Sequence, residues 1–362
     1  MSRAAGSALT RALEALGSPA GRLDEGAAAE AAALSDRLTK PRGALGRLEA
    51  IGERLAAIAR RCPPPVPQPA VVAVFAADHG VWAEGVSSWP QEVTAQMVAN
   101  LCAGGAAINV LARQGGARVV VVDVGVATPV DGAPGLVSRP VRSGTANLAV
   151  GPAMDIAEAR AAMEIGAEVA LEAVAAGASA LVTGDMGIAN TTASAAVVAA
   201  LTGLAPAALV GRGTGIDEAT LARKTAIVEG AVGRASLGDL GPVGVVAEVG
   251  GLEIAALAGF VLGGAAARVP VVLDGVIALA GTLAAAALAP EASGFCFAGH
   301  RSPEPAASAA LDHLGLEPIL DLGMRLGEGT GACLALPVLT AAARVLSEMA
   351  TFDAAGVSEK EA

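Results

Sequence analysis

The sequence predicts an α/β fold, a Rossmann-like parallel sheet flanked by helices, with a smaller helical domain formed from the N- and C-terminal segments. One observation behind it is the alternation of short apolar runs with longer segments of helical periodicity. A second is that all five apolar runs end on Asp or Gly. This pattern is typical of a parallel sheet wrapped by helices, whose site forms in the loops at the strand C-terminal ends.

The expected elements follow one another from the middle of the chain onward. The apolar runs predict strands at 70–78, 117–125, 178–185, 269–275 and 293–299. The segments between them predict helices at 92–113, 155–176, 217–236 and 251–266. The composition, with 54% hydrophobic residues and 46 glycines, fits a globular chain with close packing and tight loops.

Both ends of the chain predict helices outside this alternation. Leucine and isoleucine recur at helical spacing across residues 8–60, and residues 332–350 are apolar on one side. The proline-rich segment "CPPPVPQPA" from Cys62 predicts an extended boundary, because proline cannot continue a helix. We therefore expect a large α/β domain over 62–320 and a small helical domain built from 1–61 and 321–362.

Charge and aromatic content argue against nucleic-acid binding. The formal charge is -11, aromatic residues make up 2%, and there is no tyrosine. Phosphate backbones are bound by a surplus of Lys and Arg, and single strands by stacked aromatics. An anionic substrate must therefore be held by a local site that works against the overall field.

The cysteines and the longest uncharged run indicate where in the cell the protein is expected. The four cysteines lack the spacing of a zinc site, so buried free thiols are favoured over metal ligands or disulfides. The run 186–211 contains Asn190, Thr191 and Pro206, which favours a buried soluble segment over a membrane span. No signal peptide is recognised, and we expect a cytoplasmic protein without a membrane partner.

Three glycine-rich loops are candidates for holding a phosphate. They are "TGDMGIANTTASAA" from Thr183, "GRGTGID" from Gly211 and "AGHRSPEPAA" from Ala298. Each precedes a helical segment, and helix N-termini bind anions through free amides and the helix dipole. Helix capping and solvated surface cations are the alternative interpretations. None of the loops fits a dinucleotide or P-loop fingerprint.

Several acidic and aromatic residues are candidates for chemistry. A single acid, Asp123, lies in the strand at 117–125, which disfavours a magnesium-dependent pyrophosphate donor, and no metal or cofactor is expected. Asp78 and His79 are either a catalytic pair or structural partners at a strand end. Trp89 is either a flat wall for a planar ligand or partly core. Glu328 stands alone among glycines.

Eight segments, in order, resemble the nicotinate-nucleotide dimethylbenzimidazole phosphoribosyltransferase family. They are "FAADHGVWAEGVSSWPQEVTAQM", "GGAAINVLA", "VGPAM", "TGDMGIANTTASAA", "GRGTGID", "VGGLEIAALAGF", "PVVLDG" and "LGMRLGEGTGA". The resemblance runs from about residue 35 to about residue 350. It implies transfer of the 5-phosphoribosyl group of nicotinate mononucleotide to dimethylbenzimidazole, giving nicotinate and alpha-ribazole 5'-phosphate for cobalamin lower-ligand synthesis. It also implies a homodimer.

The resemblance also assigns residues to roles. Glu328 matches the catalytic base, which would take the azole proton while the phosphoribosyl group is transferred with inversion at C1'. The nucleotide is implied to contact Asp185, Gly187, Asn190, Thr191, Gly213, Gly215, Lys224 and Ser302. The benzimidazole is implied to contact Trp89, Gln96, Met97, Met324 and Leu326.

The sequence leaves three points about the site and its activity open. The family often has Glu where this chain has Asp185, so the shorter side chain requires a shifted loop or a water bridge. The benzimidazole positions vary, so a same-fold transferase acting on another azole, a purine or a phenol is one alternative. A non-catalytic nucleotide sensor that kept the pocket is another.

Overall fold

A computed structural model describes residues 6–130, 132–234 and 237–358. Within these ranges six parallel strands form one sheet in the order β3-β2-β1-β4-β5-β6. The strands are β1 (Ala70–Ala77), β2 (Ala117–Gly125), β3 (Val137–Ser138), β4 (Ala180–Met186), β5 (Val271–Leu273) and β6 (Cys296–Ala298). This is the strand order of doubly wound nucleotide-binding folds, and it confirms the predicted Rossmann-like class.

The predicted strands are confirmed, with differences in length. β1, β2 and β4 agree with the predicted runs to within two residues at each end. β5 and β6 have three residues each, shorter than the apolar runs 269–275 and 293–299. β3 was not predicted, because a two-residue strand is too short to show any periodicity.

The predicted helices are confirmed except at one break. α6 (Ile156–Ala175), α8 (Glu218–Arg234), α10 (Leu252–Ala266) and α13 (Thr330–Glu348) lie where expected, and residues 235–236 of the expected 217–236 helix lie outside the described residues. The single helix predicted at 92–113 is wrong. It is two helices, α4 (Val93–Ala103) and α5 (Ala107–Gly115), because Gly104 takes a φ of 81° and ends the first.

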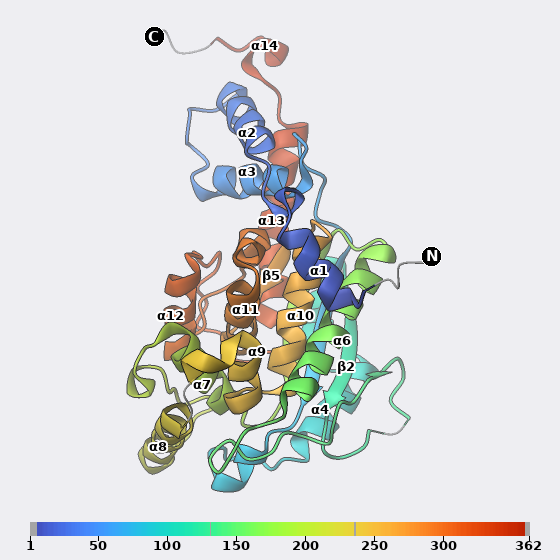
Figure 1. The fold of residues 1–362 in the computed structure, drawn as a ribbon. Helices are drawn as coiled ribbons and strands as arrows, with labels where there is room; N and C mark the ends of the chain where they lie inside the picture. Colours follow the sequence, from blue (N-terminus) through green and yellow to red (C-terminus); the bar gives the residue numbers. More distant parts are fainter. Residues whose placement is uncertain (1–5, 131, 235–236, 359–362) are drawn as a thin grey trace, which may run out of the picture.

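Four further helices complete the large body. They are α7 (Asn190–Thr202), α9 (Leu237–Val249), α11 (Val276–Leu288) and α12 (Pro305–Leu314). α6, α10 and α11 cover one face of the sheet, in front of it in Figure 1, while α4, α5 and α13 pack against the other side. α6 and α10 touch closely at Gly166 and Gly259, where an added Cβ would overlap the backbone of the facing helix.

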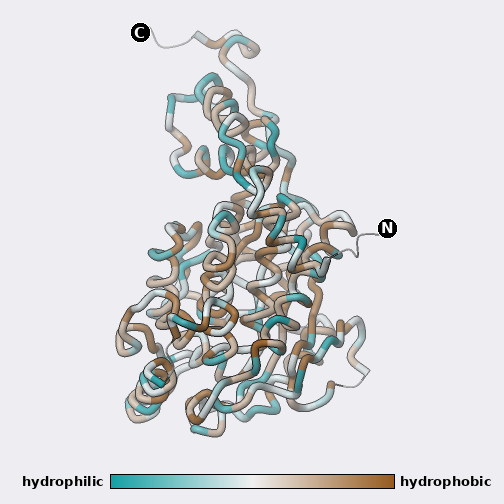
Figure 2. The backbone as a smooth tube through the Cα atoms, viewed as in Figure 1, coloured by the Kyte–Doolittle hydropathy of each residue, from teal (hydrophilic) through white to brown (hydrophobic). Residues whose placement is uncertain are grey.

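The core lies along the sheet and the helices beside it. All eight residues of β1 are buried, as are nearly all residues of α10 and α11. Figure 2 shows hydrophobic segments running through the interior of this body. The central strands therefore form a rigid frame for the loops that leave their carboxyl ends.

The helices of the two chain ends pack together, with the exception of α1. α2 (Glu25–Arg37), α3 (Arg47–Ala59), α14 (Phe352–Ala355) and the end of α13 stand together at the top of Figure 1. α1 (Ala8–Leu16) instead packs on α6 and α10 of the large body. The division into 62–320 and 1–61 with 321–362 stays a prediction, and residues 1–5 and 359–362 of it lie outside the described residues.

The uncharged run 186–211 contains the buried helix α7 of 13 residues. Two other apolar stretches have the length and composition of a membrane span, Val93–Gly115 and Thr330–Glu348. The first is broken at Gly104, and the second is mostly buried in the fold. The four thiols are free; Cys296 and Cys333 are buried as predicted, whereas Cys62 and Cys102 are only half-buried.

Candidate active site

A cavity of about 390 Å³ opens at the carboxyl end of the sheet. It lies beside the ends of β4, β5 and β6, next to the switch point between β1 and β4 where ligands bind in such sheets. Ten of the predicted site residues line it: Trp89, Met97, Asp185, Gly187, Asn190, Thr191, Gly213, Ser302, Leu326 and Glu328. The three glycine-rich loops and the Glu328 loop therefore meet at one place.

The backbone around Glu328 is left-handed over three residues. Gly327, Glu328 and Gly329 have φ values of 86°, 62° and 91°. A non-glycine residue held in this region costs about 1–3 kcal/mol and persists only where its surroundings fix it. The Glu328 N–H donates to the Asp185 carbonyl at 3.3 Å, and a Cβ on Gly184 would lie 2.6 Å from the Glu328 carbonyl oxygen. The glycines therefore allow a strained turn against β4.

The Glu328 carboxylate faces the N-terminus of α5. The side chain is buried, at 4% exposure, and its Oε2 accepts a hydrogen bond from the Ile108 N–H at 3.2 Å. Burial raises the pKa of this carboxyl, the Ile108 bond opposes that rise, and the nearby Asp274 charge adds to it. A carboxylate with a raised pKa in a cavity has the properties of a general base.

Asp185 brings a second carboxylate to the same cavity. Its Oδ2 accepts from the Asn190 Nδ2 at 2.9 Å, and its Oδ1 is buried without a hydrogen-bond partner in the described ranges. Burial first, and then the charges of Asp274, Glu253 and Glu328, raise the pKa of Asp185 well above its usual range. The two carboxylates thus share one site but have different surroundings.

Lys224 lies beyond Thr191, in a small adjoining cavity of about 60 Å³. Its Nζ donates to the Thr191 hydroxyl at 2.8 Å and to the Gly211 carbonyl at 3.1 Å. Burial lowers the pKa of Lys224 to about 8, against the opposing charge of Glu304. Thr191 and Gly213 line both cavities, so this lysine stands close behind the main cavity.

Three further predicted residues lie outside the main cavity. Gly215 lines a separate cavity with Arg212 on the outer side of the same loop. Gln96 is exposed and Met324 is half-buried, and neither lines the cavity that holds Glu328. Their sequence neighbours Met97 and Arg325 do line that cavity, so the motifs lie near the site.

Trp89 fits the interpretation as a wall for a flat ligand. It is 51% exposed, lines the main cavity, and its carbonyl accepts from the Trp82 Nε1 at 2.9 Å. Leu326, 58% exposed, lines the same cavity. An exposed aromatic on a cavity wall is available to stack on a planar ring.

The residues Asp78 and His79 have structural partners. The Asp78 carboxylate accepts from the Ala127 N–H at 2.8 Å, and the His79 Nε2 pairs with Glu253 at 2.8 Å. Both members of the second pair are fully buried, and none of the four lines the cavity. The structural interpretation of the "ADHGV" segment is therefore the better one.

Other residues of the site carried no assigned role in the sequence. Ile108 contributes a backbone N–H, Glu304 accepts from the Gly213 N–H at 2.8 Å, and Arg325 donates to the Gly213 carbonyl at 3.0 Å. His300 also lines the cavity. The segments "GGAAINVLA" and "AGHRSPEPAA" contain three of these residues. The sequence therefore marked the segments as notable but assigned no role to these residues.

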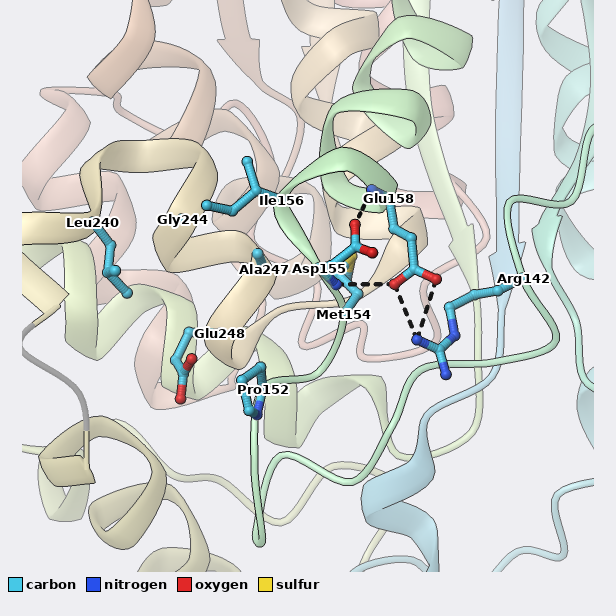
Figure 3. Close-up of a pocket in the computed structure, with 10 residues that line it drawn as sticks. All are labelled: Arg142, Pro152, Met154, Asp155, Ile156, Glu158, Leu240, Gly244, Ala247 and Glu248. Carbon is cyan, nitrogen blue, oxygen red and sulfur yellow. Dashed lines mark hydrogen bonds and ion pairs between the residues drawn. The ribbon is translucent and has the colours of Figure 1, made fainter.

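A larger cavity, of about 600 Å³, lies between α6 and α9 (Figure 3). It shares no lining residue with the cavity of Glu328. Its charged side chains are already paired: Arg142 donates to Glu158 at 3.0 Å, Glu158 accepts from the Asp155 N–H, and Glu248 accepts from Arg234. Figure 3 shows the Arg142–Glu158 pair at one side of it. The smaller cavity at the sheet end is therefore the better candidate for the active site.

Comparisons with known proteins agree with this geometry. A family model described as a phosphoribosyltransferase matches residues 20–357. The nicotinate-nucleotide–dimethylbenzimidazole phosphoribosyltransferase of Salinispora tropica is 57% identical, over 94% of this chain and 97% of that protein. The protein of the same name from Chloroflexus aurantiacus is 54% identical, also over 94% of this chain and 97% of its own length.

A solved structure gives the same result. The crystal structure of CobT from Thermus thermophilus superposes with a TM-score of 0.89 at 53% identity, over 92% of this chain and 99% of that one. The likeness in sequence and in structure spans both the sheet and the helices of the chain ends. The chain is an enzyme and belongs to this phosphoribosyltransferase family.

Proposed function

We propose that this enzyme transfers the 5-phosphoribosyl group of nicotinate mononucleotide to 5,6-dimethylbenzimidazole, with Glu328 as general base and inversion at C1'. The products are alpha-ribazole 5'-phosphate and nicotinate. The names of relatives at 54–57% identity support the substrates. The observation that carries the mechanism is the buried carboxylate of Glu328 on the wall of the cavity at the sheet end.

The leaving group needs little help from the protein. In nicotinate mononucleotide the C1' carbon is bonded to a positively charged pyridinium nitrogen. When that bond breaks, its electron pair neutralises the nitrogen, and nicotinate departs without being protonated at the ring. A general acid is therefore unnecessary for this half of the reaction.

The acceptor does need a base. One nitrogen of the azole carries a proton, and the other attacks C1' with its lone pair. Transfer of the N–H proton to the Glu328 carboxylate prevents positive charge from accumulating on the azole as the new C–N bond forms. A well-placed base contributes roughly 10²- to 10⁴-fold in rate. The raised pKa of Glu328 brings its basicity toward the useful range.

Stereochemistry and positioning complete the mechanism. Attack on the face of C1' opposite the departing ring converts a beta nucleotide into an alpha product. Asn190 and Thr191 begin α7, and Gly213 lies beside Thr191. A helix N-terminus suits the 5'-phosphate, with Lys224 behind it. Holding both rings along one line in a cavity lowers the entropic barrier of a two-substrate reaction.

The test is an assay of the purified protein with nicotinate mononucleotide and dimethylbenzimidazole. We expect acceptor-dependent nicotinate release and an alpha-configured product, seen by the coupling of the anomeric proton in NMR spectra. Glu328→Ala is expected to lose at least about 100-fold in turnover. Wild-type turnover in a folded Glu328→Ala protein would overturn the assignment of the base.

A panel of acceptors separates the alternatives. Azoles, purines and phenols, each with nicotinate release as readout, rank a same-fold transferase that prefers another acceptor. Tight binding of nicotinate mononucleotide with no product from any acceptor identifies a non-catalytic sensor. The homodimer and the cytoplasmic location stay predictions. The mass of the protein in solution tests the homodimer.

A further inference from the structure

Asp274 lies directly after β5 and is buried, at 1% exposure. Its Oδ2 accepts a hydrogen bond from the Gly329 N–H at 3.1 Å, and its Oδ1 accepts one from the Ala332 N–H at 3.0 Å. Asp274 does not line the cavity that Glu328 lines. The two carboxylate oxygens therefore bind the backbone that follows Glu328, on the side away from the substrates.

The backbone after Glu328 needs such a partner. α13 begins at Thr330, its N-cap is Gly329, and neither a capping side chain nor an acidic residue of its own occupies its first turn. The free N–H groups at a helix start require acceptors when they are buried. Asp274 supplies these acceptors from the position directly after β5. It thereby ties Gly329, the last of the three left-handed residues, to the end of β5.

Asp274 is itself held from two sides. Its own N–H donates to the Thr183 hydroxyl at 3.0 Å, and that hydroxyl donates to the Val272 carbonyl at 3.3 Å. The His300 Nε2 lies 3.4 Å from its Oδ1. The ring of His300 packs on the first turn of α13, where Gly331 leaves no room for a Cβ. The position of Asp274 is therefore fixed by β4, β5 and the loop after β6.

We propose that Asp274 is a positioning residue for the reaction: it holds the strained turn at 327–329 so that the Glu328 carboxylate points at the acceptor nitrogen. This inference rests on the proposed function, because it needs Glu328 to be the base. It adds a residue that contacts neither substrate and acts only through Glu328.

The charge of Asp274 has a second effect on the same carboxylate. The groups that face Glu328 come from four elements: the Ile108 N–H of α5, Asp185 of β4, Asp274 after β5 and His300 after β6. Asp274 adds to the burial that raises the pKa of Glu328. Removing its charge lowers that pKa, so the pH below which turnover falls moves to a lower value.

The variant Asp274→Asn tests the proposal because it keeps the shape and removes the charge and one acceptor. We expect kcat to fall about 10- to 100-fold, the effect of a misplaced catalytic group. The KM for nicotinate mononucleotide is expected to stay within about threefold, since binding contacts are intact. The acid limb of the kcat–pH profile is expected to move to lower pH.

A double-mutant cycle with Glu328→Gln separates positioning from general damage. If Asp274 acts through Glu328, adding Asp274→Asn to Glu328→Gln causes no further loss of turnover. A multiplicative further loss would overturn the proposal. The cycle also separates it from the proposed function: if Glu328→Gln alone keeps wild-type turnover, the base assignment has failed, whatever Asp274→Asn does.

Asp123 offers a matched control. It lies near the end of β2, is buried, and accepts two backbone N–H bonds, from Gly125 and Val126 at 2.9 Å each. Asp123→Asn is expected to lower the melting temperature without moving the acid limb. If both Asp→Asn variants change kcat and the acid limb equally, Asp274 has no special role.

A milder pair of variants decides the question if Asp274→Asn does not fold. Thr183→Val removes the hydroxyl that holds the Asp274 N–H, whereas Thr183→Ser keeps it. We expect kcat of Thr183→Val to fall about three- to tenfold and that of Thr183→Ser to stay near wild type. Equal kcat values in the two variants would contradict the proposal.

Discussion

The two ends of the cavity hold their charged groups in opposite ways. At the base end, the Glu328 carboxylate accepts one hydrogen bond among the described residues, from a backbone N–H, and the turn that bears it is strained. At the proposed nucleotide end, just behind the cavity, Lys224 of α8 already contacts a hydroxyl and a carbonyl. The Glu328 carboxylate has one oxygen without a hydrogen-bond partner among the described residues, whereas the Lys224 ammonium already uses two of its three donors.

On the proposed function, this difference separates the group that transfers a proton from the group that binds the nucleotide. A carboxylate with an unfilled oxygen, fixed by backbone, suits a proton transfer that occurs only during the reaction. A buried lysine that donates to a hydroxyl and a backbone carbonyl suits a positive charge held in a fixed position behind a phosphate. We therefore expect changes at the base end to alter kcat, and changes at the nucleotide end to alter the KM for the nucleotide.

The variant expected to have the largest effect at the base end is Glu328→Gln. The amide keeps the size of the side chain but cannot take a proton, so kcat is expected to fall roughly 10²- to 10⁴-fold. The dissociation constant of nicotinate mononucleotide, measured by calorimetry, is expected to change less than about threefold. A Glu328→Gln enzyme that loses nucleotide affinity as much as turnover would erase the distinction between the two ends.

At the nucleotide end, Lys224→Met keeps the buried methylenes and removes the charge. We expect the KM for nicotinate mononucleotide to rise about 10- to 100-fold, because a charge-assisted contact is worth roughly 1.5–3 kcal/mol. The expected fall in kcat is small. Steady-state kinetics with varied nucleotide measures both values.

Arg223 is the control for this lysine. It is the preceding residue of α8, is exposed, and donates to the carbonyls of Glu84 and Gly85. Arg223→Ala is expected to leave the nucleotide KM within about twofold of wild type, since surface charges contribute little. If both variants raise KM alike, the effect is one of overall charge and not of the buried position.

The fold was predictable where elements are long. β1, β2 and β4 have seven to nine residues, enough for an apolar run to be recognised, whereas β3 has two. The break between α4 and α5 was missed because helical periodicity continues across Gly104, and only its positive φ ends the helix. A two-residue strand depends on a neighbouring strand, which local patterns do not contain. The break at Gly104 is a local glycine cap that the apolar pattern does not register.

The site was predictable in part. The residues alone indicated glycine-rich loops at strand ends and a lone carboxylate at Glu328, but its role as base came from the family resemblance. Ile108, Asp274 and Glu304 were not assigned roles, because each acts through backbone groups that are distant in sequence. A residue that binds backbone has no signature of its own in a single sequence.

In the wild type, the two ends are expected to affect different kinetic parameters at opposite ends of the pH range. Burial raises the pKa of Glu328, and the base works only when ionised, so kcat is expected to fall as pH drops through that raised value. Burial lowers the pKa of Lys224 to about 8, so the KM for the nucleotide is expected to rise above that pH as the charge is lost. Each limb changes its parameter about tenfold per pH unit.

Variants test which residue causes the fall of kcat at low pH and which causes the rise of KM at high pH. Lys224→Met is expected to abolish the rise of KM at high pH and to leave the acid limb of kcat in place. A KM rise near pH 8 that survives in Lys224→Met would show that another group titrates there. Profiles of kcat and KM are measured from the lowest pH at which the protein stays folded to well above pH 8, so that both limbs are covered.

The smallest expected effect concerns the open wall of the cavity, where Trp89 is half-exposed. Trp89→Leu keeps apolar bulk but removes the ring, and aromatic stacking is worth about 0.5–1.5 kcal/mol. The KM for dimethylbenzimidazole is therefore expected to rise about two- to tenfold, with the nucleotide KM and kcat near wild type. Val150→Ala, at a more exposed apolar residue before α6, serves as the control. If Trp89→Leu raises the nucleotide KM and spares the acceptor, then the tryptophan belongs to the nucleotide end, and the boundary between the two ends must be moved.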